Sequence, residues 1–105
     1  MPLPTGLLTM VVAQLFDLGT FVTMIRRLGA SAEANPLVLA ELGSGGLPVL
    51  VLAKLCLIVL IGALSVALMS GQGPRARVAG QLLLSLGIVA GLIGGWSNAV
   101  TMGPL

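Results

Sequence analysis

The sequence predicts an all-α integral membrane protein: a three-helix bundle that runs up, down and up, with a polar connector between its first two helices. Only 8% of the 105 residues are charged, against about a quarter in a typical soluble domain, and 57% are hydrophobic. A spanning helix needs roughly 20 apolar residues, and residues 6–28, 47–69 and 78–101 each satisfy this. Most other stretches are short or polar, so residues 1–105 are expected to form a single transmembrane domain.

The first predicted helix covers residues 6–28. Thr5 is a plausible N-cap, and Gly29 suits the turn that ends the helix after Arg26 and Arg27. The opening residues have no basic segment and no small-residue cleavage site. We therefore expect the first helix to be retained and not removed as a signal peptide.

The stretch that follows the first helix is the most polar in the chain. It holds Glu33 and Glu41, two of the three acidic residues. Asn35-Pro36 favours a turn, and Pro36 could begin a short helical segment. We expect this connector to fold back over the mouth of the helical hairpin, where it would supply acceptors to nearby cations.

The second predicted helix, residues 47–69, has one charged residue, Lys54. The lone Cys56 excludes an intramolecular disulfide and is expected to be a small buried hydrophobe. A short connector then leads to the third helix, which must run antiparallel to the second.

The third predicted helix, residues 78–101, carries small residues on one face. A period of 3.6 residues groups them into a single sector of the helix surface: Gly87, Gly91, Gly94, Gly95 and Asn98. Such a face lets another helix approach closely, either within the chain or in a second copy. A substrate groove lined by exposed backbone is the alternative.

A polar stripe follows one side of the first helix. Its members recur at steps of three and four: Gln14, Asp17, Thr20, Met24 and Arg27. Asp17 lies near the middle of the span, where a charge costs at least about 2.5–3.5 kcal/mol. The stripe should therefore face protein and not lipid.

Lys54 is the predicted partner of Asp17. It lies on the second helix about 10 Å from the hairpin mouth by helical rise, within side-chain reach of Asp17. An ion pair would replace two unfavourable insertions by one neutral contact. Alternatively, Lys54 extends back towards the connector and meets Glu33.

The order of these residues resembles a family of small bacterial polytopic membrane proteins of unassigned function. The matching elements span residues 15–55: Asp17-Leu-Gly-Thr20, Gly29, Glu33-Ala-Asn35-Pro36 and Lys54-Leu. The resemblance implies a compact three-helix domain, located in a bacterial inner (cytoplasmic) membrane, with these polar residues as a shared cluster. Members of that family often have Asn three residues before the Asp, where this chain has Gln14.

Three roles remain open for the ionisable residues. They could form an ion-pair network that fixes helix register, a proton- or ion-responsive site in which Asp17 or Glu33 changes protonation, or a catalytic carboxylate pair. The corresponding functions are a structural or accessory membrane subunit, an oligomeric transporter or channel that uses Asp17, and, remotely, an intramembrane enzyme. The chain is more consistent with a protein that is not an enzyme.

The expected partners are the lipid bilayer and either a second copy or a larger membrane complex, with a dimer through the third helices preferred. The chain has no His, so no metal site and no cofactor are expected. Basic residues flank the helices without forming a stripe, which argues against nucleic-acid binding. They divide equally between the two connectors, Arg26 and Arg27 against Arg75 and Arg77. Because Glu33 and Glu41 could pair with the first two, a cytoplasmic second connector, and hence a cytoplasmic N-terminus, is slightly favoured.

Overall fold

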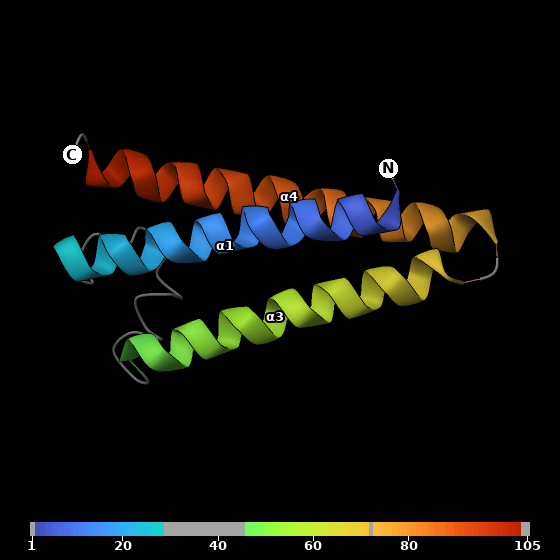
Figure 1. The fold of residues 1–105 in the computed structure, drawn as a ribbon, viewed down its shortest axis with the longest axis horizontal. Coiled ribbons are helices and arrows are strands. Elements are labelled where there is room, and N and C mark those ends of the chain that lie inside the picture. Colours follow the sequence, from blue (N-terminus) through green and yellow to red (C-terminus); the bar gives the residue numbers. More distant parts are fainter. Residues whose placement is uncertain (1, 29–45, 72, 104–105) are drawn as a thin grey trace.

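A computed structural model describes residues 2–28, 46–71 and 73–103. These residues form three α-helices and no strand: α1 (Leu3–Leu28), α3 (Gly46–Met69) and α4 (Pro74–Met102). The helices run up, down and up, so α1 and α4 are parallel and α3 is antiparallel to both (Figure 1). The predicted all-helical class and three-helix bundle are confirmed.

Two helices begin earlier than the apolar pattern predicts. In α1 the Gly6 amide donates to the Pro2 carbonyl at 2.9 Å, so Thr5 lies inside the first turn and the prediction that it caps the helix is wrong. In α4 the first residue is Pro74, which suits a first helical position because its ring fixes φ and it has no N–H to satisfy. Gly73, with φ of 105°, makes the turn into this helix.

The glycine face of α4 packs against α1 of the same chain. A Cβ atom at Gly91 would lie 2.6 Å from the carbonyl carbon of Ala13, and one at Gly95 would overlap the ring of Phe16. Gly91 and Gly95 are both buried, so these contacts lie inside the described structure. Of the two packing arrangements that the sequence allowed for this face, the chain adopts the internal one, which leaves the face closed to a second copy.

The remaining helix, α3, packs against the other two mainly at its C-terminal end. There Met69 packs over Gly80 of α4, and Ser65 is fully buried. Towards Gly46 the axis of α3 diverges from α1 (Figure 1). Cys56 lies on the outer side of α3 and is exposed, so the expectation of a buried cysteine is wrong.

The surface of the bundle is apolar along most of its length. All three helices are long and apolar enough to cross a membrane, as in a multi-pass membrane protein. Large hydrophobic side chains are exposed on each of them, for example Val12 at 58%, Val59 at 70% and Ile93 at 64%. A surface of this kind suits lipid and is uncommon on soluble monomers.

Candidate functional site

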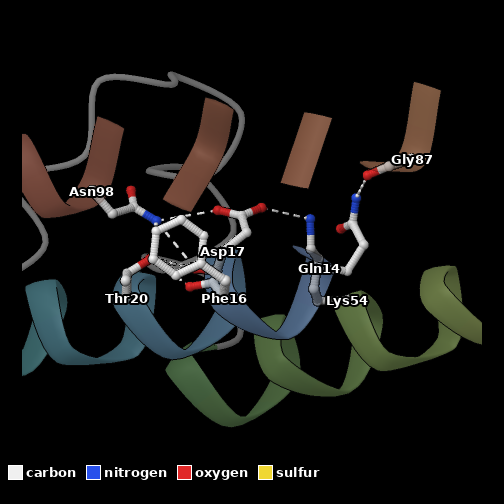
Figure 2. Close-up of polar contacts among 7 residues, drawn as sticks. All are labelled: Gln14, Phe16, Asp17, Thr20, Lys54, Gly87 and Asn98. Carbon is white, nitrogen blue, oxygen red and sulfur yellow. Dashed lines mark hydrogen bonds and ion pairs between the residues drawn. The ribbon is translucent and has the colours of Figure 1, made fainter. Parts of the chain in front are cut away.

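Asp17 is the residue at which polar contacts from all three helices meet. It lies in the middle part of α1, and its carboxylate is 18% exposed. The ammonium of Lys54, from α3, lies 2.9 Å from Asp17 Oδ2 and forms an ion pair with it (Figure 2). Of the two arrangements predicted for Lys54, the structure therefore shows the pair with Asp17.

Asn98 brings α4 into the same cluster. Its side-chain Nδ2 donates towards Asp17 Oδ1 at 3.1 Å, the Asp17 carbonyl at 3.1 Å and Thr20 Oγ1 at 3.2 Å (Figure 2). Thr20 can accept because its own hydroxyl donates back along α1 to the Phe16 carbonyl at 2.7 Å. The two carboxylate oxygens of Asp17 thus have separate partners, a cation on one helix and an amide on another.

Gly94 makes room for this arrangement. A Cβ atom at Gly94 would lie 2.5 Å from Asp17 Oδ1, closer than any real side chain could be. Asn98 follows Gly94 by one helical turn and lies on the same face. The glycine admits the carboxylate between the two helices, and the amide one turn later meets it.

Gln14 forms a second polar contact between α1 and α4. Its Nε2 donates to the Gly87 carbonyl at 2.6 Å, and the residue is only 3% exposed. Gly87 has no side chain to shield its carbonyl oxygen, so the amide of the facing helix reaches it. Gln14 and Asp17 therefore both lie on the side of α1 that meets α4, whereas the polar stripe predicted only that this side faces protein.

The remaining predicted residues are not part of this cluster or cannot be placed in it. Met24 is buried, while Arg26 and Arg27 are exposed in the last turn of α1. Arg27 Nη1 lies 4.0 Å from the sulfur of Met102. Glu33, Asn35, Pro36 and Glu41 lie outside the described residues.

The cluster has a balanced charge. One carboxylate meets one ammonium, and the other partners are a neutral amide and a hydroxyl. Within residues 2–28, 46–71 and 73–103, no group of three or more His, Cys, Asp or Glu side chains could hold a metal ion. In the same part of the chain Asp17 has no second carboxylate beside it, because the other acidic residues are Glu33 and Glu41. The described arrangement can hold helices together or exchange a proton at Asp17.

Sequence reasoning gave Lys54 as a partner for Asp17, but it did not predict which groups Asp17 and Gln14 would meet on α4. It placed Asn98 on the glycine face without assigning it a contact. The available signal was the one-turn spacing between Gly94 and Asn98, which puts a small residue and an amide in line. The backbone carbonyl of Gly87 carried no signal in the sequence pattern.

Comparison of the chain with protein-family models, with curated proteins and with solved structures gives no match. The resemblance therefore stays a prediction based on the motif, which consists of Asp17, Thr20, Glu33, Asn35, Pro36 and Lys54. The geometry of the described helices is the basis for the functional argument that follows.

Proposed function

We propose that the protein is a small integral membrane protein that serves as a structural or accessory subunit. The observation that carries the proposal is the double satisfaction of Asp17, whose two oxygens are held by Lys54 of α3 and Asn98 of α4. A carboxylate occupied on both sides is suited to fix the register of three helices. It is less suited to releasing and rebinding an ion on each cycle.

The partner of such a subunit would meet an outer surface of the bundle. The glycine face of α4 is covered by α1, so a homo-oligomer or larger complex would use exposed apolar surface. Of the three described helices α3 is the least buried, and its outer side includes the exposed residues Cys56 and Val59. We place the bundle in a bacterial inner membrane, as the motif resemblance implies.

Proton or ion transport through Asp17 is the second candidate function. One observation favours it: the ion pair is not sealed, because the side chain of Lys54 is 26% exposed. Intramembrane carboxylates often mark proton or ion paths. Transport would also require several copies, since three helices enclose little space.

Flux measurements separate the two functions. The protein is reconstituted into liposomes, and proton and cation flux is compared with empty liposomes and with Asp17→Asn protein. The structural role predicts no flux above the empty liposomes for either sample. Flux by the native protein that Asp17→Asn abolishes would overturn the structural proposal in favour of transport.

Partner binding tests the accessory role directly. Chemical crosslinking in membranes, followed by purification in mild detergent, is expected to capture either a second copy or another membrane protein. The matched sample carries Val59→Glu, which places a charge on the outer side of α3 and is expected to abolish the crosslink. A native protein that stays monomeric and captures no partner would contradict the accessory role.

A further inference from the structure

Towards the Gly46 end of α3, the helices α1 and α3 diverge (Figure 1). A groove lined by residues of both helices lies there. Its volume is about 350 Å³, within the range of small-molecule sites. Val22 and Arg26 of α1 lie on one side, and the other side includes Leu47, Val51 and Leu55 of α3. The groove therefore runs from the last turn of α1 to the residue that follows Lys54.

Among the described residues that line the groove, all are apolar except Arg26. The cation of α3, Lys54, is next to the groove residue Leu55 in sequence and is already paired with Asp17. Arg26 is exposed, and it forms no ion pair with any residue in the described part of the chain. A guanidinium is always charged and binds phosphate oxygens in a bidentate manner, so an anion is the ligand it suits.

We propose that this groove binds one acyl chain of an anionic phospholipid, with the lipid phosphate at Arg26. The groove has the polarity of such a molecule, with a cation at one end and apolar walls below it. From Leu47 to Leu55 the helix rises about 12 Å, close to the depth of one leaflet's hydrocarbon, about 15 Å. The inference rests on the proposed membrane location and not on the accessory role.

The charge pattern favours a lipid over a protein helix as the occupant. A partner helix would need to place an acidic side chain beside Arg26 and fill the space beside Val51 at the same time. An anionic lipid brings both groups on one flexible molecule and is present wherever the bundle is embedded. Basic pockets between spanning helices bind anionic lipid headgroups in other membrane proteins.

The test is a count of retained lipids. The protein is reconstituted into vesicles of equal parts phosphatidylglycerol and phosphatidylcholine with identical acyl chains, extracted in mild detergent and analysed by native mass spectrometry. We expect one retained phosphatidylglycerol per chain. Arg26→Gln should lower the ratio of retained phosphatidylglycerol to phosphatidylcholine about fivefold, the loss expected when one cation no longer contacts the anionic headgroup bound in the groove.

Matched variants show whether the groove is responsible. Arg75→Gln removes an exposed cation from the first turn of α4, at the other end of the bundle, and should leave the ratio unchanged. Val51→Phe fills the groove and should reduce retention of both lipids. Val59→Phe adds the same bulk on the outer side of α3 and should not. Helical circular dichroism checks that each variant is folded.

Three results would overturn the proposal: no retained lipid, retention without preference for phosphatidylglycerol, or equal losses from Arg26→Gln and Arg75→Gln. Flotation of the vesicles distinguishes this failure from failure of the membrane location. Protein that floats with the vesicles but keeps no lipid contradicts the groove alone. Protein that does not float contradicts the membrane location itself.

Discussion

Asp17 combines a costly position with a complete set of partners. A charged residue near the centre of a span costs at least about 2.5–3.5 kcal/mol when it is inserted alone. Here the ammonium of Lys54 neutralises one oxygen, and the amide of Asn98 meets the other. Because each partner comes from a different helix, loss of either leaves part of the carboxylate unsatisfied.

Removal of Lys54 is expected to destabilise the bundle. Lys54→Met leaves the Asp17 carboxylate without its cation, and we expect the free energy of unfolding to fall by about 2–3 kcal/mol. This is below the usual cost of breaking a fully buried pair, about 3–5 kcal/mol, because Asn98 still donates to the other carboxylate oxygen of Asp17. The measurement is unfolding in mixed micelles, followed by circular dichroism.

A double-mutant cycle isolates the pair. Asp17→Asn with Lys54→Met should cost less than the sum of the two single changes, by at least about 1 kcal/mol. Arg75→Met is the control, because it removes an exposed cation that has no ion pair among the described residues, and it should change stability by less than about 0.5 kcal/mol. Additive effects at Asp17 and Lys54 would contradict a stabilising pair.

At position 98, removal of the amide side chain should destabilise the bundle less than its replacement by a carboxylate. Asn98→Ala removes a donor and leaves Asp17 Oδ1 unsatisfied, which we expect to cost about 1–3 kcal/mol. Asn98→Asp is nearly isosteric but places a second carboxylate 3.1 Å from the first, so it should destabilise more at neutral pH. If Asn98→Asp is the milder change in the same unfolding assay, Asn98 does not act as a donor to Asp17.

For single residues, the sequence shows which polar side chains need a partner more reliably than it shows which residue the partner is. The apolar surroundings of Asp17 and Lys54 require each to find an opposite charge, and their depths along two antiparallel helices make the pair geometrically reasonable. The donor role of Asn98 could not be derived in the same way. It depends on the rotation of α4 against α1, which is set by the glycine contacts and not by the charges.

Among the elements, the pair α1 and α4 is the core of the fold. The two helices are parallel, so they can approach along much of their length, and glycines at Gly87, Gly91 and Gly95 bring their backbones together. Small residues serve this purpose in spanning helices, where the hydrophobic effect does not drive helices together. The close contact also exposes the Gly87 carbonyl to Gln14.

Adding a methyl group to this contact should force the helices apart. At Gly91 a Cβ atom would meet the backbone of Ala13 at 2.6 Å, and backbone cannot rotate away as a side chain can. We expect Gly91→Ala to lower the free energy of unfolding by about 1–3 kcal/mol, the usual cost of overpacking. Thermal unfolding in mild detergent gives the measurement.

Gly19 is the matched control for this change. It also lies within a helix, but a Cβ atom there would meet nothing within 4 Å. Since Ala is the better helix former by about 0.8–1 kcal/mol in water, Gly19→Ala should be neutral or stabilising. Equal losses from both variants would show that glycine flexibility matters here and not the close contact of α1 with α4.

The glycine face is predictable from the sequence, but its occupant is not. A row of glycines shows only that some helix approaches, and the same pattern fits a second copy as well as α1. The order of the helices along the chain does not reveal this contact either, because α1 and α4 are not consecutive and connectors favour contacts between consecutive helices. The internal contact depends on Ala13 and Phe16 lying at matching heights on α1, which the glycine pattern alone does not reveal.

In the whole molecule, the outer surface is apolar, whereas the contacts between the helices include polar groups. Polar contacts lie between the helices at Asp17 and Gln14, whereas large apolar side chains such as Val59 and Ile93 cover the outside. In a soluble protein this distribution would promote aggregation. In a bilayer it is the stable one, because the exposed apolar side chains meet lipid while Asp17 and Gln14 meet polar groups of the protein.

The single cysteine provides a test of this orientation. Cys56 lies about 15 Å from the Gly46 end of α3 by helical rise, on the outer side of the bundle. If α3 crosses the bilayer, hydrocarbon covers the thiol, and a charged maleimide present on both sides of the vesicles should not label it. Denaturation in sodium dodecyl sulfate should then make labelling rapid.

A position at the end of the same helix gives the comparison. Ser70→Cys in a Cys56→Ala background places the thiol just after α3, at an exposed site in the turn towards α4. It should be labelled in intact vesicles when the reagent is on both sides. If Cys56 is labelled as fast as this variant, water reaches the outer side of α3. The outer side of α3 would then line an aqueous path, which is not consistent with a surface that faces lipid or a partner helix within the membrane.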